Sequence, residues 1–369
     1  MLASALRNRS DVAVGLSVSR QSDMRATFCQ LGLPLDEVPT YNGPLEFLAA
    51  SLNVRRATQR LVAQAHAFRA DVVVSVMTHL WTPLVAPALR RAGIAYVPMI
   101  HDATVHPGDV GLLWNWRLRR ELAAASMAFT FSRAVERQVR AVRPDLSLVR
   151  VTLGAHLPGV RPYPTATPRP PPAGPDFLLF GRLRRYKGLD LLRDAFEVVR
   201  QCHPTARLRI VGQGPVERLA PGLASLPGVT VEQRWVDESE IPALMAAADV
   251  VVLPYREASQ SGVVPIALAC GVPVVATAVG GLAEQIQDGV NGAVVATPSA
   301  PALATAMLRL CDGSLRARLR RGAQGSGATL NDWDGHAAAL VLALRAGLAP
   351  PVRSDAIAPV YGEALAVQG

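Results

Sequence analysis

Short runs of β-branched residues alternate with longer amphipathic stretches along most of this chain of 369 residues. Such alternation is typical of βαβ units, in which helices connect the strands of a parallel sheet. We therefore predict an α/β fold with one doubly wound parallel sheet in each half of the chain. The predicted strands cover residues 12–18, 72–77, 94–100 and 127–131, and in the second half 177–180, 207–211, 229–232, 249–253, 272–276 and 292–295. The predicted helices of the first half cover residues 46–68, 84–91, 114–124 and 133–142. In the second half one helix is predicted to start at residue 189, and two others to cover residues 301–310 and 332–345.

A proline-rich segment separates the two halves. Residues 158–175 read PGVRPYPTATPRPPPAGP, and proline both fixes φ and lacks the N–H that a sheet would need. This composition favours an extended, stiff linker. We therefore predict a first domain over residues 1–158, a linker over 159–176, a second domain over 177–328 and a loose tail over 349–369.

Composition restricts the class of protein further. Half of the residues are hydrophobic and 18% are charged, as in a globular protein. No uninterrupted apolar run reaches the ~18 residues that span a bilayer, and the first residues lack a basic-then-apolar leader. The four cysteines form no CxxC pair, so neither a disulfide framework nor a zinc site is indicated. We expect a cytoplasmic protein, either soluble or peripheral at the inner face of a membrane.

The net charge of +9 is unevenly distributed, because residues 1–158 hold 18 arginines against 11 acidic residues. One interpretation is a set of solvated helix faces. The other is attraction to an anionic membrane surface or to an anionic acceptor. Nucleic acid is not an expected partner, because no aromatic residues are interleaved with the basic ones.

The segment FGRLRRYKG carries the clearest chemistry. A predicted strand ends at Phe180, Gly181 opens a turn, and Arg182 and Lys187 precede a predicted helix. Two cations at the carboxyl end of a strand, beside a helix N-terminus, form a natural diphosphate site. The alternative is a surface turn with ordinary charges. Lys187 is the only lysine among 38 basic residues, which hints that this position needs an ammonium group.

Three further loops follow predicted strands of the second half. One is Gly212–Gln213–Gly214 and another is Gly280–Gly281. The third contains Ser261 and Gly262, directly before an apolar helix that would start at Val263; backbone amides there would face an anion, and Ser261 could cap the helix or donate to a phosphate. Because the carboxyl ends of parallel strands meet at one edge of a sheet, we expect all four loops to converge.

These segments resemble a known family. FGRLRRYKG, IVGQGP, YREASQSG and ACGVPVVATAVGGLAEQIQDGVNG follow the order found in GT-B glycosyltransferases of family 4, and the likeness covers residues 10–345. The resemblance implies two Rossmann-like domains facing across a cleft, with a helix over 332–347 that joins the first domain. It also implies retaining, metal-independent transfer, without a cofactor, from a UDP- or GDP-linked sugar to a carbohydrate or lipid-linked acceptor in polysaccharide or glycolipid biosynthesis.

The resemblance also implies roles for particular residues. Arg182 and Lys187 would grip the donor diphosphate, and His101 with Asp102 would be catalytic, facing the transferred sugar. A histidine there could bond the sugar or stabilise charge, although a His-Asp pair at a strand end is also a common structural turn. His79 and His106 are weaker candidates of the same kind. The other implied donor contacts are Gly212, Gly214, Glu257, Ser261, Gly262 and Val263.

The family's metal independence agrees with the position of the only DxD, Asp332–Trp333–Asp334, at the start of a predicted helix. We interpret these aspartates as helix-start residues with a capping role.

The chain departs from the family pattern in two places. The two glutamates that family members carry fall on Ala258 and Ile266, so either Glu257 contacts the donor alone or the ribose is held differently. Residues 2–19 resemble the end of the family's first helix and its second strand, so the central first strand and its glycine-rich loop would be missing. Our hypothesis is that the chain is a truncated version of a longer, active enzyme.

Two other functions remain open on the sequence alone. A nucleotide-sugar epimerase could use the same architecture and would need no acceptor. A non-catalytic GT-B binding or scaffold protein would explain Ile266 and the missing strand.

Overall fold

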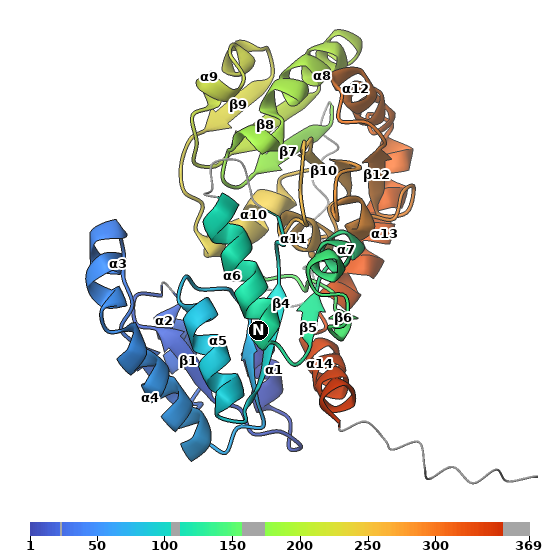
Figure 1. Ribbon diagram of the computed structural model, residues 1–369. Coiled ribbons are helices and arrows are strands. Elements are labelled where there is room, and N and C mark those ends of the chain that lie inside the picture. Colours follow the sequence, from blue (N-terminus) through green and yellow to red (C-terminus); the bar gives the residue numbers. More distant parts are fainter. Residues whose placement is uncertain (23, 105–110, 157–173, 350–369) are drawn as a thin grey trace, which may run out of the picture.

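The computed structural model describes residues 1–22, 24–104, 111–156 and 174–349, arranged as two α/β domains (Figure 1). Most of the predicted linker, the predicted tail from residue 350 onwards and His106 lie outside the described residues. All strand pairs of the described residues are parallel.

The second domain is built on a six-stranded sheet with the order β12-β11-β10-β7-β8-β9. The chain winds outwards in both directions from the neighbours β7 and β10, and this reversal is the switch point of a doubly wound sheet. The strands are β7 (Asp176–Phe180), β8 (Arg207–Val211), β9 (Val229–Glu232), β10 (Val250–Leu253), β11 (Val274–Thr277) and β12 (Gly292–Val295). The helices are α8 (Leu189–Cys202), α9 (Val216–Leu219), α10 (Ile241–Ala246), α11 (Val263–Ala269), α12 (Ala300–Arg309) and α13 (Gly313–Leu330).

Strand β7 shows why this sheet has helices on both faces. Phe177 and Leu179 enter the core formed with α8 and α12, whereas Leu178 and Phe180 enter the core formed with α10 and α11. Successive side chains of a strand point to opposite faces, so a strand covered on both sides is apolar throughout. The continuous run FLLF is therefore a central strand.

The first domain has a divided sheet. Strands β3, β4, β5 and β6 form one sheet in that order, and β1 and β2 form a separate pair. The strands are β1 (Leu16–Ser19), β2 (Leu35–Val38), β3 (Val72–Ser75), β4 (Ala95–Ile100), β5 (Ala128–Thr130) and β6 (Leu148–Arg150). The helices are α1 (Leu2–Arg7), α2 (Arg25–Cys29), α3 (Pro44–Ser51), α4 (Val54–Ala67), α5 (Thr82–Arg91), α6 (Gly111–Ala124) and α7 (Arg133–Val142). The hypothesis of a truncated chain stays a prediction.

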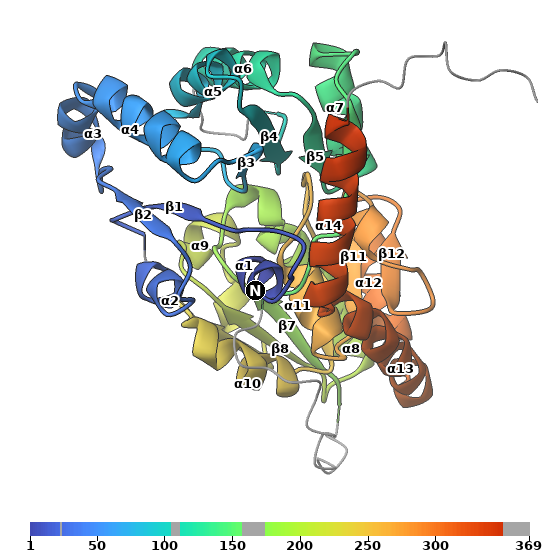
Figure 2. The ribbon, with the colours of Figure 1, turned by 90° about the horizontal axis from the view of Figure 1, so that it is seen from below.

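Helix α14 (Trp333–Leu348) runs from the second domain back onto the first (Figures 1 and 2). The side chain of Asp332 accepts a hydrogen bond from the amide of Gly335 at 2.9 Å, which confirms the capping interpretation of this aspartate. Further along, Leu340 packs in one core cluster with Val97 and Phe129 of the first domain's sheet. The helix therefore closes one face of that domain.

Several predicted elements are confirmed, and others differ. The strands at 207–211, 229–232 and 292–295 and the helix at 133–142 have the predicted bounds. The single helix predicted over 46–68 is wrong, because the chain breaks at Leu52 and Asn53 between α3 and α4.

Helix α13 was not predicted, because it contains four glycines, which lower helix propensity. Two of them have a packing reason. A Cβ at Gly322 would lie 2.0 Å from the carbonyl oxygen of Val290, and one at Gly327 would lie 2.3 Å from that of Leu268.

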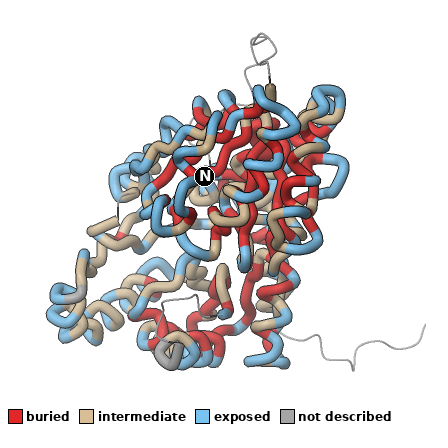
Figure 3. The backbone as a smooth tube through the Cα atoms, turned by 90° about the horizontal axis from the view of Figure 1, so that it is seen from above, coloured by how far each residue is buried: buried red, intermediate tan, exposed pale blue. Residues whose placement is uncertain are grey.

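Buried residues are concentrated in the second domain, whereas the region of α3 and α4 is mostly exposed or intermediate (Figure 3, lower left). Among the described residues, no helix is both long and apolar enough to cross a bilayer.

Candidate active site at the domain interface

The loops that follow β7 and β8 interlock through their backbones. The amide of Leu183 donates to the carbonyl of Gln213 at 2.8 Å. A Cβ at Gly212 would lie 1.9 Å from the oxygen of Gly181, and one at Gly214 would lie 2.3 Å from that of Leu183. Both predicted donor-binding glycines are therefore required by close backbone approach, which fixes the shape of the loop around them.

The first of these loops buries the ammonium group of Lys187. The residue is 6% exposed, and its Nζ donates to the phenol oxygen of Tyr255 at 2.9 Å and lies 4.8 Å from the centre of that ring. The next residue, Gly188, has a φ of 66°, and a Cβ there would lie 2.0 Å from the oxygen of Pro254. The turn that holds Lys187 is thus fixed against the third loop.

The charge of Lys187 has no counter-ion among the residues that the structure describes. No described carboxylate forms an ion pair with it, and an ammonium group can donate three hydrogen bonds. A buried charge is stable only when it is paired and bonded. The position is therefore suited to an anionic ligand. Arg182, on the same loop, is exposed.

The third loop, after β10, is held by Gln285. Its side chain accepts from the amide of Ser261 at 2.7 Å and donates to the carbonyl of Ser261 at 3.1 Å. The hydroxyl of Ser261 accepts from the amide of Val263, the first residue of α11, at 3.3 Å. The N-cap position of this helix is Gly262 and has no side-chain cap, so Ser261 does not take the capping position that we predicted. Its amide, which we predicted to face an anion, is instead bonded to Gln285.

Two other positions of this loop matter for a donor. Glu257 is exposed, and a Cβ at Gly262 would meet no described atom within 4 Å. Ile266 packs on the core of the domain and offers no polar group to a ribose.

The fourth loop joins the third loop to the first domain. A Cβ at Gly280 would lie 1.8 Å from the oxygen of Ala258, and the amide of Gly281 donates to that same oxygen at 3.1 Å. On its other side, a Cβ at Gly281 would lie 2.4 Å from Cβ of Ser132. The hydroxyl of Ser132 donates to the carbonyl of Ser259 at 3.0 Å. The two domains therefore touch at the third and fourth loops.

Glu284 strengthens this contact. Its carboxylate, in the second domain, accepts from the backbone amides of Arg133 and Ala134 at 2.8 and 3.1 Å. These amides are at the start of α7 in the first domain, where the helix dipole favours a negative charge. One domain thus caps a helix of the other.

His101 lies at the same interface, directly after β4. Its Nε2 is 3.0 Å from the carbonyl oxygen of Val76, and its ring is 4.5 Å from that of Phe131. Its Nδ1 is 2.9 Å from the side-chain amide nitrogen, Nε2, of Gln260, which belongs to the third loop of the second domain. Burial lowers the pKa of His101, while the Val76 carbonyl and the charge of Asp102 act in the opposite direction.

The structure therefore brings His101 together with the loop that contains Ser261 and Gly262. Sequence reasoning missed Tyr255, Gln260 and Glu284. All three lie inside the segments that carry the family resemblance, but their partners are distant in sequence, so no local pattern marks them.

His79 does not join this site. It packs against Tyr41 and Trp81, with each ring 5.2 Å away, and its Nδ1 accepts from the amide of Trp81 at 3.1 Å. Burial lowers its pKa. These contacts indicate a packing role. In the part of the chain that the structure describes, no three His, Cys, Asp or Glu side chains are grouped to hold a metal ion.

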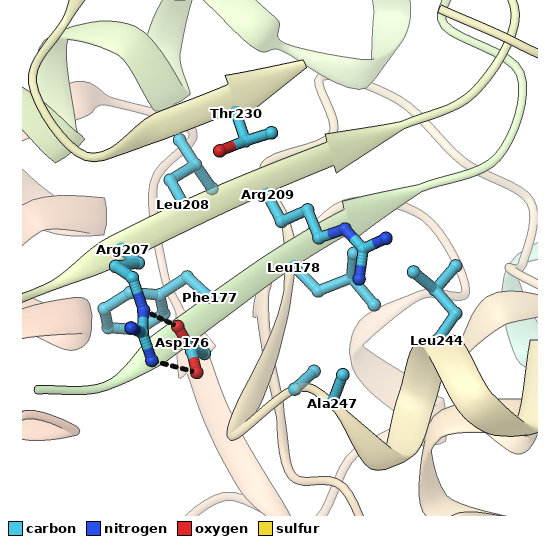
Figure 4. A pocket seen from close by; sticks show the side chains of 10 residues that line it. Asp176, Phe177, Leu178, Arg207, Leu208, Arg209, Thr230, Leu244 and Ala247 are labelled. Atoms are coloured by element: carbon cyan, nitrogen blue, oxygen red, sulfur yellow. Dashed lines mark hydrogen bonds and ion pairs between the residues drawn. The ribbon is translucent and has the colours of Figure 1, made fainter. Parts of the chain in front are cut away.

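A hollow elsewhere in the second domain is unrelated to these loops (Figure 4). It is lined by Asp176 and Arg207, which pair with each other at the first residues of β7 and β8, and by Arg209, Thr230 and Leu244. It therefore lies towards the amino ends of these strands, away from the converging loops.

Solved structures with the same architecture identify the fold. Anabaena Alr3699/HepE in complex with UDP and glucose superposes with a TM-score of 0.71 at 20% identity, covering 93% of this chain and 94% of that one. Sucrose-phosphate synthase from Thermosynechococcus elongatus superposes with a TM-score of 0.67 at 22% identity, covering 84% and 82%. The fold is that of the GT-B glycosyltransferases, with two Rossmann-like domains.

Sequence relatives identify the family. A family model described as glycosyl transferases group 1 matches residues 174–313. The GDP-mannose-dependent alpha-(1-6)-phosphatidylinositol monomannoside mannosyltransferase of Mycolicibacterium smegmatis is 32% identical over 68% of this chain and 69% of its own length. The D-inositol 3-phosphate glycosyltransferase of Xylanimonas cellulosilytica is 32% identical over 76% and 74%.

The chain belongs to the group 1 glycosyltransferases and is a nucleotide-sugar glycosyltransferase of GT-B type. These relatives, which are named as transferases, give the epimerase alternative no support.

Proposed function

We propose that the protein transfers a sugar from a UDP- or GDP-sugar to a carbohydrate or lipid-linked acceptor, with retention and without a metal ion, at an anionic membrane surface. The observation that carries this proposal is the buried ammonium group of Lys187, which lies between β7 and the N-terminus of α8 and has no described counter-ion. A departing nucleoside diphosphate would supply that counter-ion.

The donor diphosphate gains negative charge as the glycosidic bond breaks. Lys187 and Arg182 would stabilise this charge, and a buried ammonium group acts more strongly than an exposed one because the surrounding dielectric is lower. In this proposal the two cations stabilise the departing diphosphate without a metal ion. Retention itself is supported by the family resemblance.

The other donor contacts follow from the loops. Gly212 and Gly214 shape the loop around the donor, and the open space at Gly262 leaves room for it beside Val263. The hydroxyl of Ser261 accepts from Val263 and keeps its own proton to donate to a phosphate oxygen. Glu257, which is exposed, would bond the ribose. His101, with Asp102, would act on the transferred sugar from the first domain.

A membrane-bound acceptor is supported by the surface of α3. Leu45, Leu48 and Leu52 are 84%, 65% and 87% exposed and repeat at helical spacing. Arg55 and Arg56, at the start of α4, are also exposed. We call these five residues the leucine–arginine patch. Apolar side chains flanked by cations are typical of helices that lie at an anionic bilayer surface. The name of the mycobacterial relative specifies a lipid acceptor for that protein.

A thermal-shift screen tests donor binding. Ligands that bind only the folded state raise the melting temperature, so one class among UDP-, GDP- and ADP-sugars should raise it with wild-type protein. The same sugar should have a much smaller effect on Lys187→Gln. If no nucleotide sugar raises the melting temperature of the wild type, the proposed donor is wrong. Release of nucleoside diphosphate only when acceptor is present would then distinguish transfer from a scaffold role or from epimerisation.

A further inference from the structure

Gln260 reaches across the domain interface. It belongs to the third loop of the second domain, and its amide nitrogen lies 2.9 Å from Nδ1 of His101 in the first domain. The amide oxygen of Gln260 is buried and has no hydrogen-bond partner among the described residues. A glutamine with only a structural role would be expected to have both ends bonded when buried. The contact with His101 is thus the bonded end of this side chain.

The direction of this hydrogen bond follows from the other side of the ring. Nε2 of His101 faces the carbonyl oxygen of Val76, which can only accept, so Nε2 carries a proton. In the neutral imidazole, Nδ1 is then the acceptor, and the amide of Gln260 donates to it. Gln260 therefore favours one tautomer of His101 and disfavours a proton on Nδ1.

Both flanks of Gln260 are anchored. The carbonyl of Ser259 accepts from the hydroxyl of Ser132 in the first domain, and Ser261 is bonded twice to Gln285. The ring of His101 is likewise held, by Phe131 on one face and by Val76 at Nε2. Asp102, its neighbour in the chain, is the charged group that acts on the ring electrostatically. The two side chains consequently meet in a fixed geometry.

We propose that Gln260 is a positioning residue that holds His101 in its Nε2–H tautomer and thereby links the donor-binding loop to the acceptor domain. The role of His101 in sugar transfer is taken from the proposed function, whereas the contact between Gln260 and His101 does not depend on it. The third loop also carries Ser261 and Gly262, which the proposed function assigns to donor binding. One loop would therefore both bind the donor and determine which nitrogen of His101 carries the proton.

NMR titration of the histidine rings of the full chain tests the geometric claim without any substrate. Comparison with His101→Asn assigns the His101 signal, and its nitrogen shifts should report a proton on Nε2 and none on Nδ1 in the neutral form. In Gln260→Glu a carboxylate replaces the donating amide, which favours the imidazolium. The pKa of His101 should then rise by about 1–3 pH units. Gln260→Ala should raise it less, because it only removes the bond to the neutral form.

Gln59→Glu is the matched control, because it makes the same charge change on the exposed surface of α4. It should leave the His101 titration unchanged. The proposal is overturned if the pKa of His101 is the same in the wild type and Gln260→Glu, or if Nδ1 carries the proton. If Gln260→Glu does not fold, Gln260→Ala decides: the carbonyl of Val76 still favours a proton on Nε2 there, so a raised pKa of His101 supports the proposal and an unchanged pKa overturns it.

Kinetics then separate a positioning role from a merely structural one. The pH profile of kcat should move in Gln260→Glu in the same direction as the titration, with a smaller change in KM for the donor. An unchanged pH profile beside a shifted titration would overturn the positioning role. If the wild type shows no transfer with any acceptor, the proposed function fails, while the titration still decides the contact between Gln260 and His101.

Discussion

The ammonium group of Lys187 donates a hydrogen bond to the phenol oxygen of Tyr255, 2.9 Å away, and both side chains are buried. Lys187 follows β7 and Tyr255 follows β10, which are adjacent strands of the sheet. The contact therefore lies at the switch point of the doubly wound sheet, where such folds bind ligands. The hydrogen bond fixes the position of the ammonium group on which the proposed donor binding depends.

Tyr255→Phe should weaken donor binding without unfolding the protein. The substitution keeps the aromatic ring beside Nζ but removes the oxygen that orients it, and a hydrogen bond to a charged group contributes about 1.5–3 kcal/mol. We expect the Kd for the nucleotide sugar to rise about tenfold or more, measured by isothermal titration calorimetry. Tyr41→Phe, in the aromatic cluster of the first domain, is the control and should leave the Kd unchanged. An unchanged Kd in Tyr255→Phe would show that the contact does not orient Lys187.

Glu284→Ala should loosen the two domains. It removes the carboxylate that accepts from the first two amides of α7 across the domain interface, while the N-cap Ser132 stays in place, and we expect a loss of about 1 kcal/mol of unfolding free energy. Asp312→Ala removes a cap within the second domain, on α13, and should cost a similar amount. Small-angle scattering should show a larger radius of gyration for Glu284→Ala alone. Equal radii for the two variants would mean that Glu284 does not hold the domains together.

Glu121→Gln should make stability depend less on pH. Glu121 is 1% exposed and accepts from the hydroxyl of Tyr96 at 2.7 Å, and burial raises its pKa. The carboxyl group of Glu121 therefore binds a proton more readily in the folded state than in the unfolded state. Its protonation stabilises the fold at low pH, and this contribution is lost as pH rises from the pKa of the unfolded state through the pKa of the folded state. Glutamine keeps the hydrogen bond from Tyr96 and has no charge to bury. The stability of Glu121→Gln relative to wild type, from urea denaturation, should increase between pH 5 and pH 8. A constant difference would contradict the burial of a titrating carboxyl group.

The double variant Leu48→Gln and Leu52→Gln should reduce binding to vesicles that contain phosphatidylglycerol. Burying a leucine side chain is favourable by about 1.5–3 kcal/mol, so we expect at least a tenfold loss of affinity in co-sedimentation. Leu342→Gln, at a leucine 70% exposed on α14, is the control and should have little effect. If the wild-type protein does not bind these vesicles at low salt, the leucine–arginine patch does not bind membranes.

Much of the fold follows from local sequence patterns, because the central strands β7 and β10 of the second domain are short apolar runs that helices cover on both faces. The four converging loops and the cap at Asp332 were also within reach, since strand ends and helix starts have local signals. Helix α13 was not, because its glycines indicate a loop until the close approach of Val290 and Leu268 is known.

The partners at the site could not be predicted either. His101 and Gln260 are separated by 159 residues, and they meet only because the two domains pack together. Tyr255 has no local signal that marks it as a partner of Lys187, and only the fold shows that its hydroxyl lies beside that ammonium group.

The most direct measurement is the rate of sugar transfer by Lys187→Met in the presence of EDTA, compared with wild type and with Arg185→Met. Removing a donor that stabilises developing charge lowers kcat by about 10²–10³-fold, and we expect a loss of that size for Lys187→Met. Arg185 is an exposed cation on the same turn, so its variant should retain the wild-type rate. The wild type should also remain active in EDTA. A Lys187→Met enzyme as fast as wild type would contradict the central role given to this buried ammonium group.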